Sequence, residues 1–233
     1  MYHNSATQIQ KVWKGYIHRK KNIPNSLQLL GVFLNNTEIK CSSNNLDGRI
    51  NSCSDEDTCA KLLKKEYKDR IRIPTKRYWY DILVKDYQRG WIPCNIKSTL
   101  TTTSDNTGNL AMCVYAYTNH NMDILKQYNN GKMWIILLNK IKNKQYNYSL
   151  RDYYFIVINK STNGVIINGC KGLTKLTSNV NNLPFQVCWS KNIKYMYKPI
   201  HIVVNNFVKT IQHPSPSWKE MFLSKMRKLN INE

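Results

Sequence analysis

Between residues 79 and 97 the chain carries two runs of alternating apolar and polar residues, separated by a turn. The first run ends at Tyr87 and the second begins at Trp91. The three residues between them, Gln88-Arg89-Gly90, are typical of a hairpin loop that ends in glycine. The pattern therefore predicts a β-hairpin.

The register of this hairpin predicts which side chains share a face. With Tyr87 opposite Trp91, Asp81 is expected opposite Lys97, and opposed side chains lie roughly 5 Å apart. One face of the hairpin is then polar and carries Asp81, Asn95 and Lys97. The apolar face carries Ile82, Val84, Ile92, Cys94 and Ile96.

An acidic segment before the hairpin opens a predicted helix. Residues 35–51 are rich in Asn, Ser and Gly and are expected to form a loop. Ser54 and Asp57 form a variant of the capping box, so we expect the helix to begin there. Glu56 extends the apolar stripe of this helix toward the core. An acid in that position needs a cation as its partner. A small rotation of the helix would place Asp55 there instead of Glu56. Alternatively, these acids only complement the helix dipole.

The rest of the chain mixes the two periodicities. Strands are predicted over residues 133–138, 153–159, 165–168 and 185–190, and residues 110–117 fit a strand or a helix. Further helices are predicted over residues 26–34, 199–211 and 217–229. This order predicts an α/β fold with a central mixed β-sheet flanked by helices.

The first 24 residues form a separate predicted unit, a basic amphipathic helix, followed by one domain over residues 25–233. Residues 9–19 resemble the IQ motif, and such helices bind calmodulin-like partners. Alternatively, the helix packs on its own domain or contacts the DNA backbone. The matching residues are Ile9, Gln10, Lys14, Gly15 and Arg19.

Charge is the strongest compositional signal. The chain has a net charge of +21, and nine of its 14 acidic residues lie within residues 38–86, around the hairpin. A basic surface attracts polyanions, of which nucleic acid is the usual one, whereas the alternative is a charge bias that only keeps the protein soluble.

Length and composition exclude several other classes. The 233 residues, 42% of them hydrophobic, suffice for a globular core. No apolar run approaches the ~20 residues of a membrane span, and no signal peptide is expected. The seven cysteines form no Cys-x-x-Cys pair. We therefore expect free thiols, no membrane partner and an intracellular, reducing compartment such as the cytoplasm or nucleus of a host cell.

Glu56, Asp81 and the tripeptide Asn95-Ile96-Lys97 together resemble the PD-(D/E)XK nuclease superfamily, in which a helix acid precedes a hairpin bearing Asp and (D/E)-x-K. The wider stretch, residues 47–118, is similar to type II restriction-endonuclease-like proteins of large DNA viruses. The chain departs from the family at two positions. Tyr80 replaces the family's Pro, and Asn95 replaces an acid.

The resemblance implies a restriction-endonuclease-like core and sequence-specific cleavage of double-stranded DNA, with Mg²⁺, or Mn²⁺, as cofactor. Asp81 would be the central metal ligand, aided by Asn95, the backbone carbonyl of Ile96 and the outer acid Glu56. Lys97 would activate the attacking water. A homodimer would suit cleavage of both strands at a palindrome.

Two alternative interpretations of this region stay open. An uncharged Asn95 also fits a DNA-binding protein on a nuclease scaffold that no longer cuts, and Asp81 with Lys97 also fits an ordinary cross-strand ion pair. We expect the basic residues near the hairpin to contact DNA. The hydroxyl and amide side chains that follow the hairpin fit DNA contacts and ordinary turns equally well. The predicted DNA-binding residues are Lys76, Arg77, Arg89, Ser98, Thr99, Thr101, Thr102, Thr103, Asn106 and Asn109.

Overall fold

The structure is a computed structural model. It describes residues 22–39, 48–75, 78–123, 130–178 and 184–211, with two single helical positions at 224 and 227. The predicted N-terminal helix with its IQ-like residues 9–19 and the predicted closing helix over residues 217–229 therefore lie outside the described residues, apart from those two positions.

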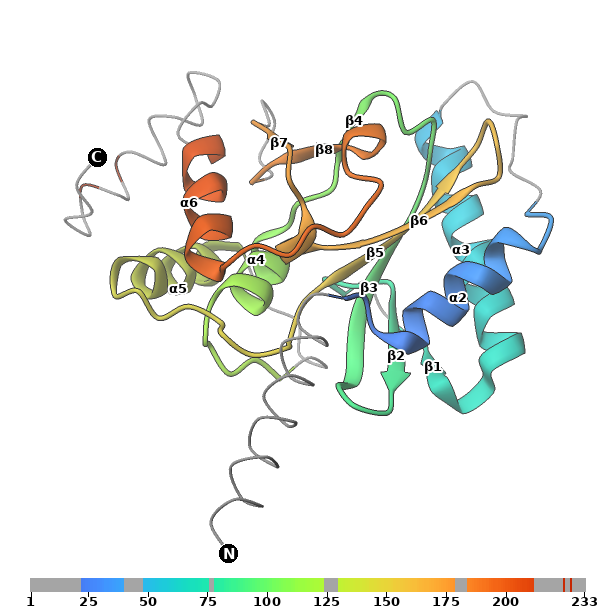
Figure 1. Ribbon diagram of the computed structural model, residues 1–233, viewed down its shortest axis with the longest axis horizontal. Helices are drawn as coiled ribbons and strands as arrows, with labels where there is room; N and C mark the ends of the chain where they lie inside the picture. Colours follow the sequence, from blue (N-terminus) through green and yellow to red (C-terminus); the bar gives the residue numbers. More distant parts are fainter. Residues whose placement is uncertain are drawn as a thin grey trace, which may run out of the picture.

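The described chain folds around a five-stranded mixed sheet of order β1-β2-β3-β5-β6 (Figure 1). Strands β3 and β5 are parallel, and the other neighbours are antiparallel. The predicted α/β class with a mixed central sheet is thus confirmed. The strands are β1 (Ile71–Arg72), β2 (Ile82–Asp86), β3 (Gly90–Thr99), β5 (Tyr154–Asn159) and β6 (Val165–Gly169).

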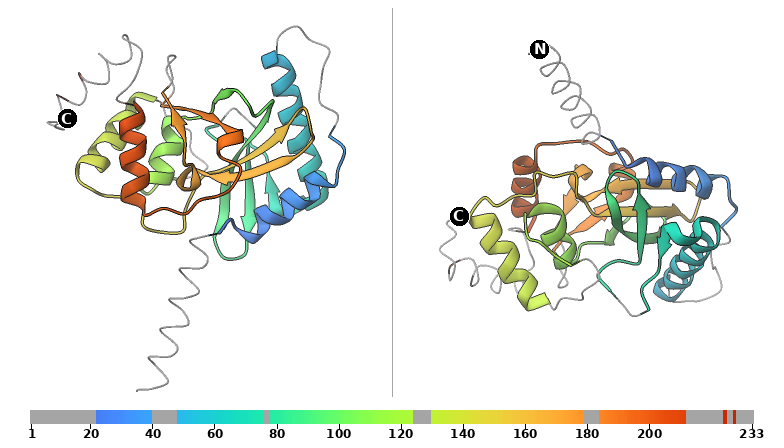
Figure 2. Two further views of the ribbon diagram at one scale, coloured as in Figure 1. Left: turned by 45° about the horizontal axis from the view of Figure 1, so that its top comes forward. Right: turned by 90° about the horizontal axis from the view of Figure 1, so that it is seen from below.

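Helices pack on both faces of this sheet. One core joins the sheet to α2 (Asn25–Asn35) and α3 (Gly48–Tyr67). The other joins it to α4 (Leu110–Tyr117), α5 (Asn130–Lys142) and α6 (Ile200–Ile211). In both views of Figure 2, α5 and α6 lie at one end of the molecule, and α2 and α3 lie at the other.

A second, three-stranded sheet of order β4-β8-β7 completes the described structure. Its strands are β4 (Ser104–Asn106), β7 (Leu176–Thr177) and β8 (Gln186–Cys188). Three short 3-10 helices, η1 (Lys68–Arg70), η2 (Cys170–Gly172) and η3 (Trp189–Lys191), join the elements. No described helix has the length and apolar character that crossing a membrane would need.

Strand β5 shows why an unbroken apolar run forms a strand here. Phe155 and Val157 belong to the core under α4, whereas Tyr154, Ile156 and Ile158 belong to the core under α2 and α3. A strand buried on both faces needs apolar residues at every position, so its sequence shows no alternation.

Several predicted elements are confirmed, and others are wrong. The helices predicted over residues 26–34 and 199–211 correspond to α2 and α6, and β5 and β6 form where strands were expected. Of the strand predicted over 185–190, only Gln186–Cys188 is extended before η3 begins. The ambiguous segment 110–117 is helix α4.

The strand predicted over residues 133–138 is instead part of helix α5. Met133, Trp134, Leu137 and Leu138 are buried, whereas Ile135 between them is 56% exposed. Burial at one-turn spacing belongs to a helix packed on one face, and a short apolar run does not reveal this by itself.

Helix α3 begins at Gly48, six residues before the start predicted from Ser54. Residues 48–51, predicted as loop, are therefore helical, and Ser54 is not the N-cap. The Ser54 carbonyl accepts a hydrogen bond from the Thr58 hydroxyl at 2.8 Å, one turn further on. Of the apolar stripe predicted for this helix, Cys59 and Leu63 are buried, whereas Leu62 and Tyr67 are half-buried.

The hairpin forms, but its register differs from the predicted one by two residues. Asp86 pairs with Gly90 and Ile82 pairs with Cys94, so the loop is Tyr87-Gln88-Arg89. The prediction that Asp81 lies opposite Lys97 is therefore wrong; Asp81, one residue before β2, lies opposite Asn95. A slip of two residues keeps every side chain on its face, so the predicted polar and apolar faces are confirmed.

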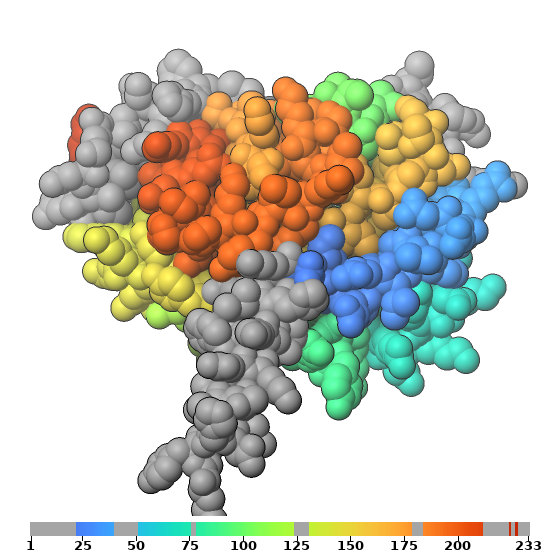
Figure 3. Space-filling model, viewed as in Figure 1, coloured from blue at the N-terminus to red at the C-terminus, as the bar shows by residue number. Residues whose placement is uncertain are grey.

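The side chain of Asp86 explains this register. Its Oδ1 accepts the backbone amides of Gln88 and Arg89, each at 2.9 Å, and closes the turn. Its Oδ2 accepts the Ser26 hydroxyl at 2.9 Å, which ties the turn to the start of α2. Gly90 then adopts a φ of 71°, which glycine reaches without strain. Figure 3 shows the hairpin tip, in green, beside α2, in blue.

Candidate active site

Strand β3 is longer than its neighbour β2, and the candidate site forms where the two part. The last β2 pair is Ile82 with Cys94, whereas β3 continues to Thr99 beside β5. We call residues 95–99 of β3 the β3 extension. In a strand, the backbone groups of alternate residues point to the same side, so those of Ile96 and Ser98 point toward the side that β2 has left.

Acidic side chains meet the backbone of the β3 extension in place of a strand. The Ile96 amide donates to Asp81 Oδ2 at 2.7 Å, and the Ser98 amide donates to the Glu56 carboxylate. The Ser98 carbonyl accepts the Ser52 hydroxyl at 3.1 Å. The hairpin acid and the helix acid are thus held side by side, each by a backbone amide.

Asn95 is bonded to Asp81 through one end of its carboxamide. Its Nδ2 donates to Asp81 Oδ2 at 2.7 Å. Its Oδ1 is buried and has no hydrogen-bond partner among the described residues. A buried acceptor without a donor is unfavourable, typically by about 1–3 kcal/mol. The Asn95 oxygen is therefore suited to an added donor or a cation.

Lys97 and Glu56 form an ion pair beside Asp81. The Lys97 Nζ lies 3.2 Å from Glu56 Oε1, and the two side chains are only 23% and 17% exposed. Burial raises the pKa of Glu56, the Lys97 charge lowers it, and the negative charge of Asp81 raises it again. Two carboxylates and one ammonium thus share a half-buried region.

Asp55, the open alternative to Glu56, is engaged elsewhere. It is 1% exposed and accepts the Ser98 hydroxyl at 3.0 Å. Its Oδ2 also pairs with the Lys160 ammonium at 3.0 Å. Of the two neighbouring acids, Glu56 is the one that contacts Lys97, and Asp55 supports the β3 extension from its other face.

Asp105 is a member of this region that the sequence did not reveal. On strand β4, its Oδ1 accepts the Thr99 hydroxyl at 3.1 Å and its Oδ2 accepts the Trp189 indole at 3.0 Å. Burial raises the pKa of Asp105, while these two hydrogen bonds and the charge of Lys97 lower it. No local signal identified it, because Trp189 lies 84 residues away.

The predicted DNA-binding hydroxyls divide into a buried and an exposed group. Ser98, Thr99 and Thr101 are buried, and Thr101 accepts the Asn159 amide at 3.2 Å. They stiffen the end of β3 and do not face solvent. Thr102 and Thr103 are exposed beyond it.

The asparagines and the basic residues that were predicted to bind DNA do not lie together at this site. Asn106 is exposed and accepts the Gln186 amide at 2.8 Å. Asn109 is the N-cap of α4, accepting the Met112 amide at 2.7 Å. Arg89 lies in the hairpin turn at the other end of β3, where it donates to the Tyr154 hydroxyl at 2.6 Å. Lys76 and Arg77 lie outside the described residues.

The oxygens of this site match the ligands of a hard divalent cation. Among the described residues no three His, Cys, Asp or Glu side chains converge to hold an ion. The candidate ligands are instead the carboxylates of Asp81 and Glu56, the orphaned Asn95 Oδ1 and the Ile96 carbonyl. Carboxylate, amide and carbonyl oxygens with water are what Mg²⁺ accepts. Because Asn95 brings no charge, a second ion would be bound weakly or not at all.

No family model matches the chain, and no curated protein or solved structure matches it significantly.

Proposed function

We propose that the protein is a metal-dependent endodeoxyribonuclease with a restriction-endonuclease-like core, acting on double-stranded DNA with Mg²⁺ or Mn²⁺. The observation that carries this proposal is the meeting of Asp81, Glu56, Lys97 and the orphaned Asn95 oxygen along the β3 extension. They come from helix α3, from the residue just before β2 and from β3, in the order that the PD-(D/E)XK resemblance implies.

The roles follow from charge and position. Asp81 and Glu56 would bind Mg²⁺ together with the oxygens of Asn95 and Ile96. When bound, the ion would stabilise negative charge on a phosphoryl oxygen and make a bound water more acidic. Lys97, held at 3.2 Å from Glu56, would donate to the attacking water and to the phosphate. The net charge of +21 would attract the DNA backbone.

Two partly buried acids, Glu56 and Asp105, surround Lys97 with negative charge and favour this role. Asp105 lies within electrostatic reach of its ammonium, and Thr99 and Trp189 hold Asp105 in turn. A cation fixed between acids is positioned before substrate arrives, and preorganised charge is the main source of catalysis in phosphoryl transfer.

Plasmid cleavage tests the proposal. Supercoiled DNA incubated with the protein and Mg²⁺ or Mn²⁺ should become nicked or linear, and a chelator should prevent this. Lys97→Ala and Asp81→Asn should each slow cleavage at least about 100-fold. The matched control is Lys85→Ala, which removes an exposed lysine from the same hairpin and should cleave at the wild-type rate.

A second candidate is a DNA-binding protein on the same scaffold that does not cut. Asn95 favours it, because an amide oxygen brings no charge to the metal. If the protein binds DNA but leaves the supercoiled substrate intact at every Mg²⁺ or Mn²⁺ concentration, this second hypothesis is favoured over the nuclease.

A further inference from the structure

The face of α2 that points away from the sheet is apolar and exposed. Leu27, Leu30 and Leu34 of this helix are buried, whereas Leu29 and Val32 are 57% and 59% exposed. We call Leu29 and Val32 the outer face of α2, and Figure 3 shows this helix, in blue, at the surface of the molecule. Because residues 29–34 are all apolar or glycine, the helix has the composition of one that is covered on both faces.

Two aromatic rings lie beside the outer face. Phe33 of α2 and Tyr67 of α3 are half-buried, and their rings meet edge to face with centroids 5.6 Å apart. The Tyr67 hydroxyl donates to the Leu29 carbonyl at 3.4 Å. Helix α2 itself carries no charged residue. The outer face is therefore suited to an apolar partner and not to a charged one.

The described chain begins only three residues before α2. The Asn22 carbonyl accepts the Arg89 guanidinium at 3.0 Å, and the Ile23 carbonyl accepts the side-chain amide of Gln28 at 2.7 Å. Pro24 is extended, with ψ at 142°, so residues 22–24 form a short connection that is not helical. Connections of about two to five residues join the antiparallel helices of a helical hairpin.

The segment before this connection carries an apolar stripe of matching spacing. As a helix, residues 9–18 would place their bases, Lys11, Lys14 and His18, opposite the stripe. Two helices rise equally, by about 1.5 Å per residue, so a turn centred on residue 23 places residue 17 opposite 29 and residue 13 opposite 33. The stripe consists of Ile9, Val12, Trp13, Tyr16 and Ile17.

The short connection favours this segment over a second copy of the chain. Two exposed side chains offer far less area than the roughly 800 Å² per partner that a standard protein interface buries. A segment tethered through three residues has an effective concentration of about millimolar, so a small apolar patch can hold it. Arg70 and Lys85 share a small hollow with Leu29, and the stripe would turn the bases of the segment away from them.

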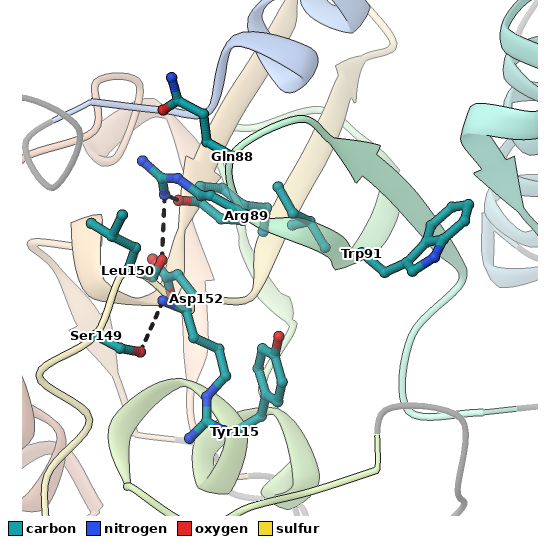
Figure 4. Close-up of a pocket in the computed structure, with 10 residues that line it drawn as sticks. Gln88, Arg89, Trp91, Tyr115, Ser149, Leu150 and Asp152 are labelled. Atoms are coloured by element: carbon teal, nitrogen blue, oxygen red, sulfur yellow. Dashed lines mark hydrogen bonds between the residues drawn. The ribbon is translucent and has the colours of Figure 1, made fainter. Parts of the chain in front are cut away.

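A cavity that Arg89 also lines is less suited to the segment. Arg89 and Arg151 line this cavity of about 430 Å³ together with Trp91 and Tyr115 (Figure 4). Its aromatic rings are already covered, because Arg72 lies 4.0 Å from the centroid of the Trp91 ring and Arg151 lies 4.9 Å from that of Tyr115. Two guanidiniums also repel a segment with five Lys or Arg and no acid in residues 1–21.

We propose that residues 9–17 dock as a helix, antiparallel to α2, on its outer face, with Ile17 against Leu29 and Trp13 against Val32 and Phe33. Docking would bury the exposed side chains of α2 between two helices and leave the bases of the segment in water. While docked, the stripe would not be available to a calmodulin-like partner. The inference does not rest on the proposed nuclease activity.

Cross-linking of the full chain tests the docking. The exposed Cys53 and also Cys41 are replaced by serine, since the other cysteines are buried. Ile17→Cys with Leu29→Cys is then treated with a short bis-maleimide, and linked peptides are identified by mass spectrometry. The matched control is His18→Cys with Leu29→Cys, which has nearly the same connecting chain but a thiol on the polar face. The first pair should link within one chain at least about tenfold faster than the control.

The other outcomes of this experiment overturn the inference. Equal rates in the two pairs would mean that the segment only collides with α2. A product that joins two chains would mean that a second copy of the protein covers the outer face. Absence of any linked product from the Ile17→Cys pair would mean that the segment does not reach Leu29.

Thiol protection tests the same contact with a different variant. Val32 and Ile135 of α5 are exposed to nearly the same extent, 59% and 56%. If the segment covers Val32, iodoacetamide should alkylate Val32→Cys at least about tenfold more slowly than Ile135→Cys. Adding Trp13→Asp to Val32→Cys should remove the difference. Equal rates for Val32→Cys and Ile135→Cys in the otherwise unchanged chain would overturn the docking.

Discussion

At the scale of single residues, Asn95 offers a test of whether the candidate site binds a metal ion. Its amide now bridges to Asp81 at 2.7 Å, so Asn95→Asp would place two carboxylates in contact. Without metal their repulsion should lower the free energy of unfolding by about 1–3 kcal/mol, and excess Mg²⁺ should restore it.

Thermal unfolding with chelator and with Mg²⁺ measures this effect. Asn143→Asp, which adds the same charge at an exposed position, is the control and should respond to Mg²⁺ as the wild type does. If the thermal stability of Asn95→Asp does not change with Mg²⁺, a cation does not bind at this position.

Asp152 makes a pH-dependent contribution at the same scale. Burial raises its pKa from 3.8 to about 6, although the charges of Lys171 and Arg89 lower it. Below the ordinary value both the folded and the unfolded chain carry the proton. As the pH rises from about 4 to about 6, the unfolded chain loses its proton first, so the stability that Asp152 contributes falls.

Asp152→Asn should therefore remove part of the stability loss between about pH 4 and pH 7. Urea unfolding at both values compares the variant with the wild type. Asp57→Asn, at an exposed position in α3, should follow the wild-type trend. A parallel trend in Asp152→Asn would contradict the expected shift.

At the scale of elements, the β2–β3 turn controls the register that brings Asp81 to Asn95. Asp86 accepts two turn amides and the Ser26 hydroxyl, and these hydrogen bonds outweigh burial and lower the pKa of Asp86. Asp86→Ala leaves these donors unpaired and should destabilise the protein by about 2–3 kcal/mol.

Chemical denaturation measures the loss, and Tyr87→Ala is the matched control. Tyr87 is fully exposed in the same turn, so its substitution should change stability by no more than about 0.5 kcal/mol. Equal losses in the two variants would show that the Asp86 cap does not stabilise the turn.

At the scale of the whole molecule, the mixed sheet separates two cores and leaves the end of β3 accessible to acids from α3 and from the hairpin. The net charge of +21 acts over this whole surface. If DNA is the ligand, several phosphate contacts should make its affinity depend steeply on salt.

With about six such contacts, DNA affinity should fall about 1000-fold between about 50 and 200 mM salt. Fluorescence anisotropy with a labelled duplex in the presence of chelator measures this without cleavage. Binding that is insensitive to salt would mean that the charge does not serve DNA recognition.

The sequence alone was sufficient wherever a local period decided the structure. The hairpin faces could be predicted because the side-chain period of a strand is two, and the observed two-residue slip does not exchange Asp81, Asn95 and Lys97 with the apolar face. The stripe of α3 also predicted an acid on its core-facing side but left Asp55 and Glu56 as alternatives, and the structure brings Glu56 to Lys97.

Prediction from the local sequence pattern failed where a contact with a distant residue determines the structure. The register depends on Asp86 bonding to Ser26, 60 residues away. The apolar run within α5 is helical because Met133, Trp134, Leu137 and Leu138 pack on one core, which a short run does not specify.

By itself, therefore, the sequence determined the α/β class and the polar face of the hairpin, since these follow from periodicity along the chain, and it narrowed the acid on the helix to Asp55 or Glu56. Only the tertiary structure decided that Asp81 meets Asn95, that Asp105 lies near Lys97, and that Arg89 and Arg151 share a cavity. Such contacts join residues far apart in sequence, and packing of the whole chain sets them rather than any local pattern.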